Sequence, residues 1–295
     1  MAKRVIGVLG ASSLVGDCLL STESVACLNT DVEYIAFSRQ SKDTDPTAGG
    51  RVSWCCLGEE GLEKGVQSIE YWICLVPIWV LPDYFPLLEH CGGRRLVALS
   101  STSRFTKTDS SDLSEKRVAA SLAAGERALI DWAEKRSVDW VILRPTLIYG
   151  SGRDKNISSI AALIRRYGFF PLFGTAQGLR QPIHASYVAT ACLQAMNHSG
   201  VVNQAYNISG SETLTYKEMV RRVFGAMGRE PRFLRVPFLV FRLTLALLHL
   251  LPRFRGVTVG MAERMNQDLI FDHSDARRDF GFKPGPFHLH RGDVG

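Results

Sequence analysis

The sequence lacks the cysteine and histidine spacings that hold a structural metal ion. It has seven cysteines, an odd number, and no two of them form a Cys-x-x-C pair. Zinc sites use closely spaced pairs of cysteine or histidine ligands, so these residues predict no metal site. Cys55 and Cys56 are adjacent in a short apolar run. We therefore expect reduced thiols, as in a cytoplasmic protein.

Long apolar runs and a secretory signal pattern are also missing. The first residues, MAKRVIGVLG, lead directly into an apolar run that is typical of a strand. The most apolar helical pattern, residues 237–252, is too short and too interrupted to span a bilayer. Its basic side chains share one face, and its other face is rich in Phe and Leu. We interpret it as a helix packed on its own lobe; a homodimer, partner or peripheral membrane contact through Phe238–Leu251 is the alternative.

The chain has no continuous basic tract, although its formal net charge is +6. Its arginine pairs, such as Arg94-Arg95 and Arg277-Arg278, lie far apart, and no nucleic-acid-binding motif accompanies them. The excess positive charge is better suited to attracting small anionic molecules than to binding DNA or RNA.

The most informative stretch that is present is VIGVLGASSLVGDCLL, residues 5–20. An apolar strand pattern ends at Gly10, and an apolar helical pattern begins after Ser13. The spacing Gly10-x-x-Ser13-x-x-Gly16 is one form of a dinucleotide-binding turn. Gly10 allows a tight turn, and Gly16 lets the helix lie close to the strand. The backbone N–H groups of this turn would then face a pyrophosphate.

Strand patterns alternate with helical patterns over the first half of the chain. Strands are expected near residues 5–9, 32–37, 52–57, 71–76, 95–99 and 140–143, and a long amphipathic helix over 115–135. The alternation predicts an α/β fold: a doubly wound parallel sheet (Rossmann fold) with a smaller discontinuous C-terminal lobe. We divide the chain into a dinucleotide-binding domain, 1–150, and a substrate or partner lobe, 151–295, partly interleaved with the sheet.

The end of the second strand bears on the choice of cofactor. Ser38 and Arg39 stand where dinucleotide folds contact the adenosine ribose, and no acidic residue occurs between Phe37 and Lys42. An acidic residue would bind the ribose hydroxyls and repel a 2′-phosphate, whereas Arg39 would attract that phosphate. The sequence therefore favours NADP(H) over NAD(H).

Several motifs together resemble the extended short-chain dehydrogenase/reductase superfamily, of the nucleotide-sugar epimerase and dehydratase type. The order and spacing of these motifs carry the resemblance, which runs from about residue 4 to 287. They are GASSLVG at 10–16, VALSST at 97–102, LRPTLIYG at 143–150, RQPIH at 180–184, YNI at 206–208 and ARRDFGFKP at 276–284.

The resemblance implies roles for particular residues. The cofactor would contact the turn, the ends of three strands and a segment closing over the nicotinamide: Gly10, Ser12, Ser13, Leu14, Val15, Gly16, Ser38, Arg39, Leu75, Val76, Pro77, Ser100, Pro145, Thr146 and Leu147. Arg180 and His184 would meet the substrate, with the arginine suited to a diphosphate. His184 could equally be a satisfied core histidine.

One departure from the superfamily pattern affects the chemistry. Redox members carry Tyr-x-x-x-Lys on the helix after the Ser-Ser strand, where the ammonium lowers the tyrosine pKa for proton transfer. This chain has no Tyr-x-x-x-Lys; counting back from Glu126, the two positions hold Val118 and Leu122.

The sequence is therefore compatible with two functions. The first is an NADP-dependent enzyme on a nucleotide-sugar-like or other carbonyl or alcohol substrate. Its substitute acid–base group would come from Ser101, Thr102, Tyr149, His184, Lys107 or Asp109. The second is a catalytically silent NADP(H)-binding structural or sensor protein, similar to the dehydrogenase-like accessory subunit of respiratory complex I.

Overall fold

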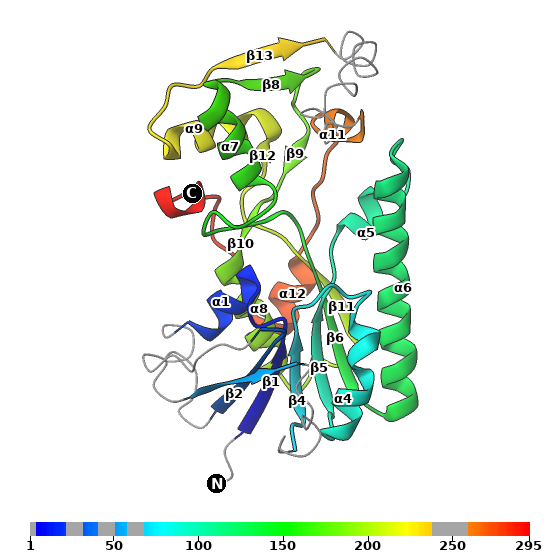
Figure 1. Cartoon of the computed structure of the whole chain (residues 1–295). Helices are drawn as coiled ribbons and strands as arrows, with labels where there is room; N and C mark the ends of the chain where they lie inside the picture. Colours follow the sequence, from blue (N-terminus) through cyan, green and yellow to red (C-terminus); the bar gives the residue numbers. More distant parts are fainter. Residues whose placement is uncertain (1–3, 22–31, 41–50, 58–67, 238–258) are drawn as a thin grey trace.

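The computed structural model describes residues 4–21, 32–40, 51–57, 68–237 and 259–295 (Figure 1). It has a parallel sheet with helices on both faces and a smaller lobe above one end of that sheet. The predicted apolar helix at 237–252, with its alternative contacts through Phe238–Leu251, lies almost wholly outside the described residues.

Seven strands form the main sheet, and every neighbouring pair is parallel. In chain order they are β1 (Arg4–Leu9), β2 (Val32–Ser38), β3 (Val52–Cys56), β4 (Tyr71–Cys74), β5 (Arg95–Leu99), β6 (Asp139–Pro145) and β11 (Gln204–Ile208). Their spatial order is β11-β6-β5-β4-β1-β2-β3, so the direction of winding reverses between β1 and β4. A crevice outside the carboxyl ends of the strands is expected at such a point. The predicted Rossmann fold is thereby confirmed.

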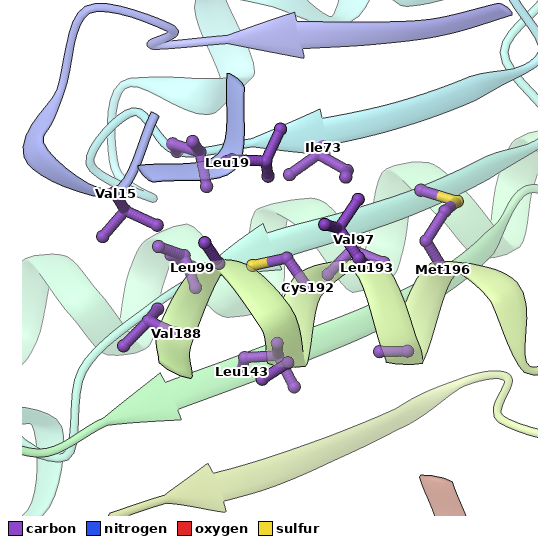
Figure 2. Packing of buried hydrophobic residues seen from close by; sticks show 14 of the residues in the cluster. Val15, Leu19, Ile73, Val97, Leu99, Leu143, Val188, Cys192, Leu193 and Met196 are labelled. Carbon is purple, nitrogen blue, oxygen red and sulfur yellow. The ribbon is translucent and has the colours of Figure 1, made fainter. Parts of the chain in front are cut away.

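Helices cover the sheet because successive side chains of a strand point to opposite faces. On one face, α1 (Leu14–Leu20), α8 (Ala185–Asn197) and α12 (Ser274–Phe280) pack on residues such as Ile6, Val8 and Val97. Figure 2 shows α1 and α8 side chains meeting those of β4, β5 and β6. On the other face, α4 (Phe85–His90) and α6 (Leu113–Arg136) pack on Leu9 and Leu96.

The smaller lobe has a separate apolar core. It contains α7 (Ile157–Tyr167), β8 (Phe170–Phe173), β9 (Leu179–Arg180), β12 (Leu214–Thr215), α9 (Tyr216–Ala226), β13 (Phe233–Val236) and α11 (Val259–Arg264). Parallel β8 and β13 lie over α7 and α9, beyond the carboxyl edge of the main sheet (Figure 1).

The chain passes between sheet and lobe more than once. A short parallel pair, β7 (Ile148–Tyr149) with β10 (Ile183–His184), joins the two parts, after which α8 and β11 return to the main sheet. Three short helices complete the described structure: η2 (Leu81–Tyr84), α5 (Ser103–Thr106) and η4 (Arg291–Asp293). None of the described helices combines the length and the hydropathy that crossing a bilayer requires.

Candidate functional site

The turn between β1 and α1 has the backbone shape that its sequence predicts. Gly10 adopts φ +77°, and a Cβ there would lie 2.8 Å from the backbone nitrogen of Val76. A Cβ on Gly16 would lie 2.2 Å from the carbonyl oxygen of Ala11. Both contacts are shorter than any side chain tolerates, so glycine is required at each position. The close approach of helix and strand is the geometry that dinucleotide-binding turns use.

Ser13 begins α1 and acts as its N-cap. Its hydroxyl accepts a hydrogen bond from the N–H of Gly16 at 3.1 Å, and its own N–H donates to the carbonyl of Gly10 at 3.0 Å. Ser13 therefore stabilises the turn from within, while the positive end of α1 faces the carboxyl edge of the sheet.

An arginine that the sequence analysis missed also lies at this turn. Arg153, in the loop after β7, forms an ion pair with Asp17 of α1 and donates to the carbonyl of Ser12 at 3.1 Å. It adds a guanidinium beside the predicted phosphate position. The sequence gives little indication of this contact, because the loop Ser151-Gly152-Arg153 lies far from the turn along the chain.

Residues at the ends of β2 and β4 lie at the same sheet edge as the turn. The register pairs Leu9 with Phe37 on one side and with Cys74 on the other, so Ser38 and Leu75 flank Gly10. Ser38 and Leu75 are buried, whereas Arg39 and Pro77 are exposed. Exposure leaves the Arg39 guanidinium accessible to a ligand at this edge.

At the end of β5, three hydroxyl side chains have different partners. Ser100 donates to the carboxylate of Glu126 at 2.6 Å, and Thr102 donates to the carbonyl of Pro145 at 3.2 Å. Ser101 instead accepts, from the N–H of Ser103 at 3.1 Å. The proton of the Ser101 hydroxyl is thus left available for a further partner.

Glu126 is the centre of a buried ionic cluster behind Ser100. Its side chain is 0% exposed, and it accepts from the Nε of Arg144 at 3.0 Å and from its Nη2 at 2.6 Å. Arg104 of α5 forms a second ion pair with the same carboxylate. Burial lowers the pKa of both guanidiniums, and each arginine still pairs with the one carboxylate. The cluster therefore carries one surplus positive charge at the carboxyl edge of the sheet.

The two α6 positions at which the superfamily pattern places tyrosine and lysine contribute only hydrocarbon. Leu122 is 3% exposed within the core between α6 and the sheet, and Val118 packs against the same core. Neither side chain can exchange a proton.

The segment after β6 crosses from the sheet toward the lobe. Thr146 donates its N–H to the carbonyl of Ile208 at 3.0 Å and its hydroxyl to the carbonyl of Gln181. Leu147 packs against the core of the lobe, whereas Pro145 is buried at the end of β6. These three predicted cofactor contacts thus span the boundary between sheet and lobe.

Tyr149 and His184 lie together, but each has a partner within the protein. The Tyr149 hydroxyl donates to the carbonyl of His288 at 3.0 Å, its side chain is 1% exposed, and burial raises the pKa of Tyr149 to about 12. His184 begins α8, with its Nδ1 2.7 Å from the Ser186 hydroxyl and its Nε2 3.6 Å from Asp293. Both side chains are therefore held in place by the structure around them.

Arg180 is 4% exposed and binds backbone carbonyls. It donates to the carbonyl of Gln267 at 2.7 Å and to that of Arg264, and its guanidinium lies over the ring of Tyr216. Burial lowers the pKa of Arg180 to about 10. These contacts connect β9 to the segment after α11.

Among the residues that the structure describes, no three His, Cys, Asp or Glu side chains gather as metal ligands.

Comparisons with known proteins agree with this fold. A family model described as the NAD dependent epimerase/dehydratase family matches residues 85–209. UDP-glucose 4-epimerase from Vibrio cholerae is 24% identical over 181 residues, which cover 60% of this chain and 52% of that protein. Subunit 9 of the NADH dehydrogenase [ubiquinone] 1 alpha subcomplex, a mitochondrial protein from Arabidopsis thaliana, is 25% identical over 151 residues, covering 51% of this chain and 35% of that protein. The chain thus spans about half, or less, of these curated relatives.

Solved structures match over nearly the whole chain. UDP-glucuronic acid 4-epimerase from Bacillus cereus, solved in complex with NAD, has a TM-score of 0.70 at 14% identity, covering 99% of this chain and 94% of that one. UDP-glucose 4-epimerase from Thermotoga maritima, solved with UDP-glucose, has a TM-score of 0.67 at 16% identity, covering 99% and 96%. At such identities the likeness shows the fold. The chain therefore shares the fold of these structures, and its residues 85–209 are similar to the NAD-dependent epimerase/dehydratase family.

Proposed function

We propose that this chain is an NADP(H)-binding protein that lacks the tyrosine-dependent chemistry of its redox relatives and acts as a structural or sensor protein. The single observation that carries the proposal is the pairing of a complete dinucleotide turn with an α6 that has Val118 and Leu122 in the acid–base positions.

The turn fits a dinucleotide on two grounds. Gly10 and Gly16 allow the tight turn and the close approach of α1 to β1, since a Cβ at either position would meet backbone atoms, and dinucleotide-binding turns use this geometry to bring backbone N–H groups to a pyrophosphate. The α1 dipole adds positive potential at the same place, and the guanidinium of Arg153, which is paired with Asp17, lies beside it. Exposed Arg39, with no acid beside it in the sequence, supports a contact to the 2′-phosphate of NADP(H).

The hydroxyl groups after β5 and in β7 support a protein without catalytic activity. A general acid must have a proton that it can donate to the substrate. Thr102 and Tyr149 donate theirs to backbone carbonyls, and Ser100 donates to Glu126. When bound, the nicotinamide would supply hydride chemistry, but these residues are engaged elsewhere.

An NADP-dependent enzyme acting on a nucleotide sugar or another carbonyl substrate is the second candidate. Ser101 favours it, because its hydroxyl oxygen accepts from Ser103 and its proton is left to donate. The distant likeness to a UDP-glucose 4-epimerase suggests the substrate class. In this alternative His184 would contact the substrate, whereas Arg180, which is 4% exposed and donates to backbone carbonyls, would have to release them before it could bind a diphosphate. A cytoplasmic location fits either function, as the cysteine spacing in the sequence predicts.

Two variants of Ser13 test dinucleotide binding. Asp and Asn are both good N-caps, so Ser13→Asp and Ser13→Asn should keep α1 folded. Only the aspartate places a negative charge beside the pyrophosphate. We expect NADPH, titrated by fluorescence, to bind at least tenfold more weakly to Ser13→Asp than to Ser13→Asn, since like charges a few ångströms apart repel by about 1–4 kcal/mol. Equal affinities, at unchanged thermal stability, would contradict a phosphate site in this turn.

Turnover then separates the two functions. With NADPH bound, the silent protein should not oxidise it in the presence of aldehydes, ketones or UDP-glucose. Turnover that Ser101→Ala abolishes, without loss of NADPH affinity, would instead establish the enzyme.

A further inference from the structure

A cavity of about 570 Å³ lies between α5 and α6, among the residues that the structure describes. Arg104, Phe105 and Thr108 line it on one side, and Lys116, Ala120 and Ala123 of α6 line it on the other. Its volume is within the range of about 300–1,000 Å³ that is typical of small-molecule sites.

The cavity faces away from the core-packed side of α6. At 100° per residue, Lys116, Ala120, Ala123 and Arg127 recur along one stripe of this helix. The two alanines and Lys116 line the cavity, whereas Arg127 lies one turn further along the stripe; both cations are exposed. Leu122 points into the core instead. The cavity is therefore separate from the α6 positions that face the dinucleotide in the family pattern.

The charges around the cavity are of one sign. Arg104 shares the carboxylate of Glu126 with Arg144, so one of these two guanidiniums has no counter-charge of its own. Arg144 and Arg127 both add to the positive potential at Arg104. None of the described residues lining the cavity is acidic. An anion bound there would neutralise a charge that the protein leaves unbalanced.

An aromatic surface accompanies these charges. Phe105 is 45% exposed, and the guanidiniums of Arg104 and Arg144 lie 5.6 and 5.3 Å from the centre of its ring. An exposed phenyl ring on a short helix gives an apolar ligand group a surface to pack on.

We propose that the α5–α6 cavity is a second ligand site, which binds the phosphate monoester of a small molecule with an apolar or aromatic body. Arg104 and Lys116 bind the phosphate, the ring of Phe105 packs on the body of the ligand, and the α6 alanines form the floor. The proposal is independent of dinucleotide binding.

Phenyl phosphate is a suitable probe, measured by calorimetric titration beside phenol, its uncharged counterpart. We expect saturable binding of one phenyl phosphate per chain and none of phenol. Lys116→Gln should weaken binding about two- to fivefold, as expected for one exposed ion pair. Lys135→Gln, the same change in the last turn of α6, is the matched control and should leave the affinity unchanged. Ala123→Leu should fill the cavity and abolish binding while thermal unfolding shows that the protein remains folded.

The Ser13→Asp variant distinguishes this site from the dinucleotide turn. Phenyl phosphate should bind it as it binds the unaltered protein. The proposal is overturned if the unaltered protein shows no saturation, if Lys135→Gln weakens binding as much as Lys116→Gln does, or if Ser13→Asp removes phenyl phosphate binding.

Discussion

Replacing Glu126 with glutamine tests whether the buried ionic cluster is held together by this one carboxylate. The side chain is 0% exposed and receives donors from Ser100, Arg144 and Arg104. Glutamine keeps the shape but leaves two guanidiniums, 16% and 26% exposed, with no counter-charge in the cluster. Removing one partner of a buried ion pair costs about 3–5 kcal/mol. At about 2–4 °C per kcal/mol for a chain of this size class, Tm should fall by roughly 10 °C.

Arg104→Gln is the matched change on the other side of the cluster. It leaves Glu126 paired with Arg144 through three hydrogen bonds, and the removed guanidinium is partly exposed, so we expect a loss of only about 1 kcal/mol. Urea unfolding followed by tryptophan fluorescence would measure both variants, with the slope of the transition as a check on two-state behaviour. The reasoning is refuted if Glu126→Gln costs less than about 1 kcal/mol, or if Arg104→Gln costs as much as Glu126→Gln.

Two further predictions concern the cofactor and the C-terminal segment. Arg39→Asp should weaken NADPH binding more than NADH binding, because the new carboxylate repels the 2′-phosphate but accepts from ribose hydroxyls; equal losses in parallel titrations would exclude the phosphate contact. His273 contacts the Ser209 hydroxyl through Nδ1 and faces Arg277 through Nε2, and burial, together with Arg277, lowers the pKa of His273. The folded protein therefore favours the neutral imidazole, so its stability should be full above about pH 6.5 and fall as the pH drops below that value, by up to about 1.4 kcal/mol per pH unit for one proton. Urea unfolding at pH 7.5 and at pH 5.5 would measure how much unfolding free energy each variant loses on acidification. The loss should be smaller in His273→Asn than in the control His90→Asn, whose histidine is exposed. Equal losses in the two variants would contradict this role of His273.

Much of the sheet could be predicted from local pattern. The strand expected at 95–99 is β5, and the helix expected at 115–135 is α6, Leu113–Arg136. Periodicity reports which face of an element is buried, and it does so within a window of about a dozen residues. The place of β11 beside β6 was harder to predict, since the two strands are separated by the whole of α7 to α8.

The candidate site likewise has features that local sequence predicts and features that depend on distant contacts. The need for glycine at Gly10 and Gly16 follows from contacts with residues near in sequence or on the adjacent strand, and the motif spacing predicts it. The partners of Tyr149 and Arg180 are different, because they lie on the C-terminal segment, 139 residues from Tyr149 and 84 to 87 from the arginine. No local pattern records such a pairing. The sequence analysis could therefore name these side chains as candidates without knowing that their polar groups are engaged.

The order of residues by itself determined the parallel fold and the shape of the turn between β1 and α1, because both depend on short-range sterics and on the periodicity of apolar side chains. Tertiary structure alone decided that Glu126 gathers two arginines, that Arg153 reaches the turn from the loop after β7, and that an alanine-floored cavity opens between α5 and α6. The physical reason is that charge pairing and cavity shape arise where distant segments meet, and the chain must fold before those segments share a surface.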